Sequence, residues 1–143
     1  MKQFLILSTI FCLLTGTTNG QQSNATLKLD FITKIPSVID GCSGLYTYDA
    51  TSLKKEKYII VWDLQEIAFI KVQGKEIKLQ TTDKKELPKS VYKATFKGGG
   101  YTVILTTKTV KKTGEESSLD NGTLEIIKGS DKLLIKIHGE SGC

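Results

Sequence analysis

The sequence predicts an all-β fold, a single compact antiparallel β-barrel or sandwich of about eight strands with meander connections. Apolar residues recur with a period of two along most of the chain, and Gly-containing turn sequences separate these runs at hairpin intervals. Such alternation buries one face of each strand and leaves the other in water, as antiparallel sheets allow. Because an open sheet would expose its edges, we expect the strands to close into a barrel or to pack as two sheets.

The chain begins with a segment that has the features of a secretory signal peptide. Lys2 precedes an apolar run from Phe4 to Leu14, and small and polar residues follow up to Gly20. The apolar run is too short to span a bilayer. We therefore divide the chain into a signal peptide, residues 1–20, and a single antiparallel β domain, residues 21–143. We expect an exported protein, periplasmic or extracellular, with no transmembrane segment in the mature chain.

Five strands are predicted in the first half of the mature chain. Leu27, Leu29 and Phe31 alternate with polar residues in the first of them, and Gln73-Gly74 is a hairpin turn sequence between the last two. The sequence Asp40-Gly41 marks a turn after the first strand. These strands span residues 25–33, 43–49, 57–63, 66–72 and 75–81.

Four more strands follow in the second half. Leu133, Ile135 and Ile137 alternate with polar residues in the last of them. The strands span residues 91–97, 100–109, 122–128 and 131–138. The turn sequences that separate them are Gly98-Gly99-Gly100, Thr113-Gly114, Asn121-Gly122 and Gly129-Ser130.

Two segments between the strands, residues 50–57 and 83–89, are candidates for a helical turn. Neither is long enough to bury an amphipathic face. Pro36 and Pro88 lie outside the predicted strands, where the missing N–H group interrupts no ladder.

The cysteines predict one long-range disulfide. Cys12 lies in the leader, so the mature chain keeps Cys42 and Cys143. Two cysteines in an exported domain favour a disulfide over a metal or catalytic pair. In the chain-entropy model, closing a loop of roughly 100 residues contributes about 4.7 kcal/mol. We expect this bridge to close the seam of the barrel; a free thiol at Cys143 or an intermolecular bond is the alternative.

The charged residues argue against nucleic-acid binding. All 20 basic residues are lysine, against 15 acidic residues, which gives a net charge of +5. Arginine is the preferred residue for bidentate contacts to phosphates and base edges, and this chain has none. We interpret the net positive charge as the result of lysines on solvent-exposed strand faces. The alternative is that it attracts the protein to an anionic envelope surface.

Motifs for catalysis or metal binding are sparse. His138 is the only histidine, and no Gly-x-Ser-x-Gly motif occurs. Zinc needs three or four ligands, which one histidine and two bridged cysteines do not supply. We interpret Glu115-Glu116 as a solvated hairpin tip, and Gly98-Gly99-Gly100 lacks the spacing of a phosphate loop. We therefore expect no catalytic residue, no metal and no cofactor.

Aromatic residues cluster on neighbouring predicted strands, and we expect most of them to fill the interior. The alternative is that Tyr48, Trp62 or Tyr101 lies exposed near the Gly-rich turn and anchors a partner. The aromatic residues concerned are Tyr46, Tyr48, Tyr58, Trp62, Tyr92, Phe96 and Tyr101.

Several segments carry a resemblance to a known family. They are the early cysteine with its C-terminal counterpart, residues 68–79 (AFIKVQGKEIKL), Ser90-Val91-Tyr92 and Phe96-Lys97-Gly98. Together they resemble the MliC-type inhibitors of C-type lysozyme, which are small antiparallel β-barrels of the periplasm or membrane surface. The resemblance implies that Ser90 and Tyr92, with Lys97 and Gly98, are binding residues that enter the lysozyme cleft. It further implies that Ser90 and Lys97 are exposed on adjacent loops.

The function predicted from the sequence is that of an exported, non-enzymatic binding or structural module. Its partner would be a protein or a cell-envelope ligand. Inhibition of a C-type lysozyme is the alternative. A small hydrolase is a second alternative, which requires His138 to lie within about 3.2 Å of a serine hydroxyl or a carboxylate.

Overall fold

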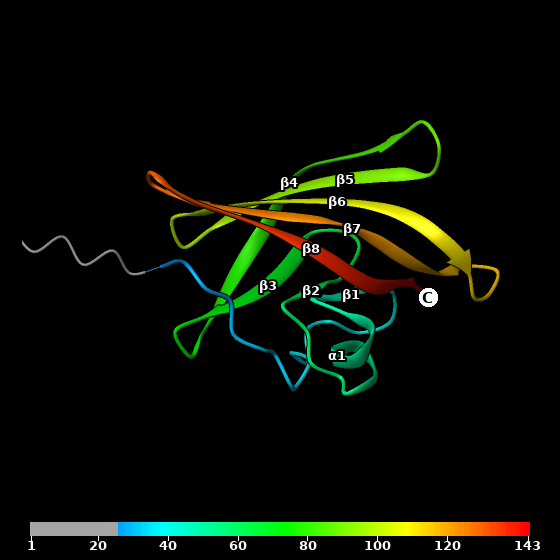
Figure 1. Cartoon of the computed structure of the whole chain (residues 1–143), viewed down its shortest axis with the longest axis horizontal. Helices are drawn as coiled ribbons and strands as arrows, with labels where there is room; N and C mark the ends of the chain where they lie inside the picture. Colours follow the sequence, from blue (N-terminus) through cyan, green and yellow to red (C-terminus); the bar gives the residue numbers. More distant parts are fainter. Residues whose placement is uncertain (1–25) are drawn as a thin grey trace, which may run out of the picture.

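Eight antiparallel strands, each paired with the next along the chain, close into a barrel (Figure 1). The computed structural model describes residues 26–143. The strands are β1 (Ser43–Thr47), β2 (Ile60–Trp62), β3 (Ile67–Val72), β4 (Lys75–Leu87), β5 (Val91–Gly98), β6 (Tyr101–Lys112), β7 (Ser117–Lys128) and β8 (Asp131–Gly142), with one helix, α1 (Ala50–Lys54), after β1. The predicted all-β meander is confirmed, and the barrel is the form it takes. The predicted signal peptide and Cys12 lie outside the described residues.

The seam between β1 and β8 is closed by backbone pairing and by a disulfide. Ser43 lies opposite Gly142 in the ladder. The next residues outward, Cys42 and Cys143, are bonded to each other, with 4.1 Å between their Cα atoms. The predicted bridge and its place at the seam are confirmed. Such bonds form in oxidising compartments, so the bridge indicates an exported environment. None of the helical residues within 26–143 makes a segment with the length and apolarity to cross a membrane.

Alternate side chains of the long strands fill the barrel. On β6, Tyr101, Val103 and Leu105 are buried, whereas the residues between them are partly exposed. Trp62 and Phe96 meet edge to face in the interior, with ring centroids 5.2 Å apart. This packing confirms the two-residue period as the signal for the core.

The first predicted strand is wrong. Residues 26–33, here called the strap, form no strand and make a single bridge, from Ile32 to Tyr58. Leu29 is 2% exposed and belongs to the barrel core. Alternation therefore identified the buried side chain, but a closed barrel has no free edge with which the strap could pair. It is tied instead to the β3–β4 hairpin, because Asp30 N–H donates to the Lys71 carbonyl at 2.8 Å.

A second apolar cluster covers the outer face of the short strands. Ile32, Leu45, Tyr58 and Val61 are buried there, and Leu53 of α1 packs against them. The helix lies in the first segment for which a helical turn was predicted. Asp49 begins it, since its carboxylate accepts from Ser52 N–H at 2.7 Å. This hydrogen bond lowers the pKa of Asp49.

Two other local predictions are wrong. The segment 83–89 forms no helical turn, because β4 continues past a bulge at Thr81 and Asp83 and pairs with β5 as far as Leu87. Asn121-Gly122 is not a turn but lies inside β7. A Cβ atom on Gly122 would lie 1.9 Å from the Thr106 carbonyl oxygen, so glycine permits the close approach of β6 and β7.

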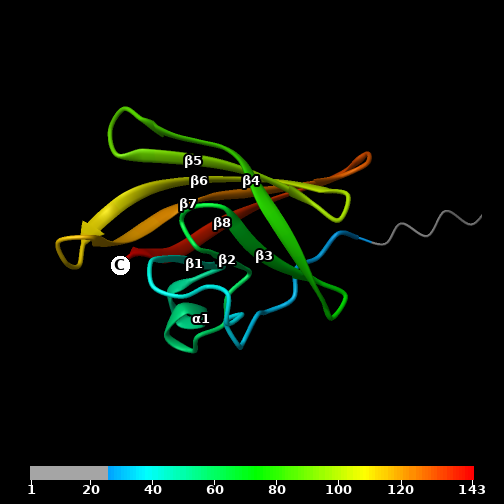
Figure 2. The same cartoon turned by 180° about the vertical axis from the view of Figure 1, so that it is seen from behind.

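The strands differ greatly in length, and this difference shapes one end of the barrel. β1, β2 and β3 have 5, 3 and 6 residues, whereas β4, β6, β7 and β8 have 12 or 13. The β4–β5 and β6–β7 hairpins therefore extend well past the β2–β3 loop (Figures 1 and 2). We call this the open end; the strap lies at the opposite end.

Candidate functional site

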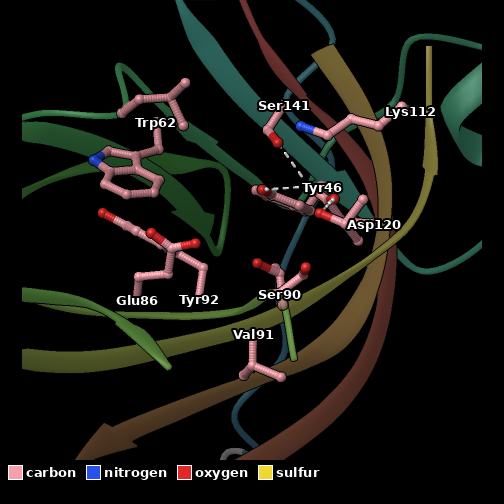
Figure 3. Close-up of a pocket in the computed structure, with 12 residues that line it drawn as sticks. Tyr46, Trp62, Glu86, Ser90, Val91, Tyr92, Lys112, Asp120 and Ser141 are labelled. Atoms are coloured by element: carbon pink, nitrogen blue, oxygen red, sulfur yellow. Dashed lines mark hydrogen bonds between the residues drawn. The ribbon is translucent and has the colours of Figure 1, made fainter. Parts of the chain in front are cut away.

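A cavity of about 380 Å³ lies at the open end of the barrel, among residues of the overhanging hairpins (Figure 3). Its floor consists of buried residues and its rim of exposed or half-buried ones. The floor is formed by Tyr46, Trp62, Thr107 and Asp120, and the rim by Leu64, Glu86, Ser90, Val91, Tyr92, Thr109, Lys112 and Ser141. This volume falls at the lower end of the range of small-molecule sites, roughly 300–1,000 Å³.

Asp120 is the centre of the floor. It is 3% exposed, and its carboxylate accepts four hydrogen bonds from hydroxyl groups. Ser118 and Thr109 donate to Oδ1 at 2.8 and 3.1 Å. Ser141 and Tyr46 donate to Oδ2 at 2.7 and 3.2 Å, and Figure 3 shows both side chains turned toward the carboxylate. We call these five residues the Asp120 cluster; they come from β1, β6, β7 and β8.

Asp120 forms no ion pair with another described residue. Within residues 26–143 the one ion pair joins Lys132 to Glu125 at 3.4 Å, outside the cavity. The four hydroxyl donors are therefore its direct partners, and they stabilise the buried carboxylate. Burial, together with the negative charge of Asp120, raises the pKa of Tyr46. Tyr46 thus stays protonated and keeps its role as a donor.

Two charged residues of opposite sign lie on the rim. Glu86 comes from β4 and Lys112 from the end of β6, and both are exposed. Partial burial, together with the charge on Glu86, raises the pKa of Tyr92 on the neighbouring strand. The rim is therefore mixed in charge, whereas the floor carries only the negative charge of Asp120.

An aromatic wall closes one side of the cavity. The rings of Trp62 and Tyr92 lie 5.8 Å apart at an interplanar angle of 34°. Trp62 is 1% exposed, and within the described part of the chain its Nε1–H group has no hydrogen-bond acceptor. Buried donors are normally satisfied by protein, solvent or ligand. Trp62 is also the single tryptophan of the chain, which makes it a specific optical reporter.

Backbone strain is present at the rim. Leu64, Lys89 and Ser90 have φ angles of 60°, 66° and 57°, in the left-handed region that non-glycine residues rarely adopt. Asp63 holds the loop that contains Leu64, since its Oδ1 accepts from three successive backbone N–H groups at 2.8 to 2.9 Å. Strain of this kind is found at ligand clamps and switch regions.

The residues assigned by the family resemblance do not form one site. Ser90 and Tyr92 lie at the rim of the cavity. Lys97 and Gly98 lie at the far end of β5. Each residue of the strand adds about 3.3 Å to their separation from Ser90. Ser90 and Lys97 are both exposed, but the prediction that they share adjacent loops is wrong. A Cβ atom on Gly98 would lie 2.3 Å from the Lys78 carbonyl oxygen, so this glycine serves strand packing.

Most predicted aromatic core residues are buried. The prediction is confirmed for Tyr46, Tyr58, Trp62, Phe96 and Tyr101. Tyr48 is 36% exposed, and its hydroxyl donates to the Leu29 carbonyl in the strap.

His138 is paired with an amide. Its Nδ1 lies 2.6 Å from Asn121 Oδ1 on the neighbouring strand. Among the described residues, its hydrogen-bond partner is therefore neither a serine nor a carboxylate. In the same part of the chain, no three His, Cys, Asp or Glu side chains form a group that could hold a metal ion.

A second cavity, of about 430 Å³, lies at the strap end of the barrel. Its charges are balanced, with Lys28 and Lys128 against Asp30 and Asp131. Lys128 is already engaged, since it donates to the Tyr101 hydroxyl at 3.3 Å and lies 4.5 Å from the centre of that ring. The open-end cavity is therefore the better candidate site.

Sequence reasoning missed Asp120. The sequence Asp120-Asn121-Gly122 has the composition of a tight turn, which placed Asp120 outside any strand. A signal was present, because Ser118 and Asp120 continue the inward positions of Leu124 and Ile126 at a spacing of two. Comparison of the chain with family models, curated proteins and solved structures found no match.

Proposed function

We propose that this protein is an exported, non-enzymatic binding protein that holds one small organic molecule in the open end of its barrel. The cavity of about 380 Å³, with a polar floor and an aromatic wall, carries the proposal. Eight-stranded barrels have an interior that is either filled by side chains or able to hold one small ligand. In this chain the cavity at the open end has a buried carboxylate in its floor and an aromatic wall, whereas the cavity at the strap end has balanced charges and a lysine that is already engaged.

The polar floor is preorganised for binding. The members of the Asp120 cluster are fixed by mutual hydrogen bonds and come from several strands rather than from loops. A site that is already ordered avoids much of the entropy cost of binding.

Two features support an exported location. The sequence predicts a leader that would direct the chain out of the cytoplasm, and the bond between Cys42 and Cys143 is typical of an oxidising environment. We propose the periplasm or the extracellular medium as the place where the protein binds its ligand.

Inhibition of a C-type lysozyme stays a prediction. Ser90 and Tyr92 lie on an overhanging hairpin, which favours it, but Lys97 lies at the other end of β5. A single insertion into an enzyme cleft cannot use both ends of this strand. The cavity therefore supports small-molecule binding better.

Fluorescence of Trp62 tests the proposed function. The purified mature protein is titrated with three aromatic molecules of similar size, 2-phenylethylamine, 2-phenylethanol and 3-phenylpropionate. We expect at least one of them to change the emission of Trp62 in a saturable manner with one site per chain, because the cavity includes Trp62 and its neighbour Tyr92.

A matched pair of variants locates the binding. Thr109 and Thr102 lie on the same strand, Thr109 in the cavity rim and Thr102 on the outer face. Thr109→Phe should abolish the saturable change and Thr102→Phe should keep it, with circular dichroism confirming that both are folded. An unchanged titration for Thr109→Phe, or no saturable signal for any of the three molecules, would refute the proposed function.

A further inference from the structure

We propose that the ligand of the open-end cavity is a small organic cation, a protonated amine on an apolar body. This inference rests on the proposed binding function and names its ligand class. The polar floor, the aromatic wall and the position of the charged residues each contribute to it.

The direction of the hydrogen bonds in the Asp120 cluster is the first argument. A hydroxyl group has one proton to donate and two lone pairs that accept. Tyr46, Thr109 and Ser141 each donate to the Asp120 carboxylate. Their protons are therefore used, and toward a ligand these hydroxyl groups can only accept. An ammonium group, with three donors and no acceptor, matches such a floor.

The charge of the floor is the second argument. The four hydroxyl donors occupy the acceptor sites of Asp120 but leave its negative charge in place, and no described residue forms an ion pair with it. A buried charge without a counter-ion attracts a cation and repels an anion more strongly than a charge in water does. Glu86 adds a second negative charge at the rim.

The aromatic wall is the third argument. The faces of tyrosine and tryptophan rings attract cations, by about 0.5–2 kcal/mol depending on desolvation. Tyr46, Trp62 and Tyr92 all line the cavity. Rings together with carboxylates form a cation site, whereas an anion would face both negative ring surfaces and negative charges.

Lys112 is the one basic residue that lines this cavity, and it supplies the sharpest test. It is exposed at the end of β6, so its ammonium group opposes the entry of a cation without being needed for folding. Its neighbour Lys111 is equally exposed but does not line the cavity. The same substitution at the two positions separates the cavity from the general surface charge.

The experiment compares 2-phenylethylamine, 2-phenylethanol and 3-phenylpropionate at neutral pH, with Trp62 emission as the signal. We expect the amine to bind about tenfold more tightly than the alcohol and the carboxylate to bind most weakly. Lys112→Met should tighten the binding of the amine several-fold and Glu86→Gln should weaken it, each by more than it changes the binding of the alcohol. Lys111→Met should leave all three unchanged.

The outcomes separate the two proposals. Absence of saturable binding for all three molecules would overturn the proposed function and this inference together. Saturable binding in which the alcohol or the carboxylate equals or exceeds the amine would overturn the cation inference alone. If the Lys112→Met variant bound the amine more weakly than the wild type does, this result would overturn the cation inference as well. Glu86 and Lys112 are exposed, so loss of folding does not obscure these comparisons.

Discussion

At the scale of single residues, Asp120 illustrates how a barrel can keep a charge inside without a cation. Its four hydroxyl donors replace the water that the carboxylate loses on burial. The arrangement also fixes Tyr46 as a protonated donor, because ionisation of Tyr46 would place two negative charges side by side. The cluster is therefore sensitive to alkaline pH.

We expect the substitution Tyr46→Phe to flatten the loss of stability at alkaline pH. Burial and Asp120 raise the pKa of Tyr46 in the folded state, whereas tyrosines of the unfolded chain titrate near about 10. Above that pH the unfolded chain binds fewer protons at this site than the folded one, so the free energy of unfolding falls as pH rises. Urea denaturation at a series of pH values from about 9 upward measures this slope.

Tyr48→Phe is the control for this prediction. Burial also raises the pKa of Tyr48, but this side chain is 36% exposed, so its removal should change the slope less. Equal slopes for the wild type and Tyr46→Phe would show that Tyr46 does not govern the alkaline limb.

At the scale of elements, the strap shows the difference between a burial pattern and a strand. The alternation of Leu27, Leu29 and Phe31 correctly predicted which side chain enters the core. It could not predict backbone pairing, because the pairing depends on whether β1 has a free edge. β8, at the other end of the chain, occupies that edge.

We expect Leu29→Ala to destabilise the protein by about 2–5 kcal/mol, the usual range for truncating a buried leucine. Leu29 is 2% exposed and fills the end of the barrel. Urea denaturation of the oxidised protein measures the difference. Leu134→Ala is the matched control, since Leu134 is 63% exposed on β8 and its truncation should cost little. Similar midpoints for Leu29→Ala and the wild type would mean that the strap does not contribute to the core.

The sequence did not predict the ends of the long strands or the site, and both failures have the same physical cause. Period-two alternation marks a strand only where one face is apolar. In the overhanging parts of β4, β6 and β7 the inner face borders a polar cavity, so residues such as Glu86, Thr109 and Asp120 replace the apolar ones. The fold class, the core and the disulfide could thus be predicted from the sequence. The cavity could not be predicted, because polar lining residues interrupt the apolar alternation from which the strands were predicted.

At the scale of the whole molecule, the disulfide should be the largest single contribution to stability. Cys42 and Cys143 are 101 positions apart, and the chain-entropy model gives about 4.7 kcal/mol for a loop near this length. We expect Cys143→Ser to lower the free energy of unfolding by a similar amount, and Cys42→Ser to match it. Equal denaturation midpoints for wild type and variants, with the wild type shown by mass to be oxidised, would contradict this.

The position of that bond links the order of the cavity to the redox state of the protein. It lies at the open end, where β1 carries Tyr46 and β8 carries Ser141, both donors to Asp120. Without the disulfide, only backbone hydrogen bonds and these contacts through Asp120 hold the two strands together at this end. The cavity is therefore fully braced only when the two thiols are oxidised. Reduction of the bond should loosen the end of the barrel at which Tyr46 and Ser141 meet Asp120, so the redox state of the surroundings controls how well ordered the cavity is.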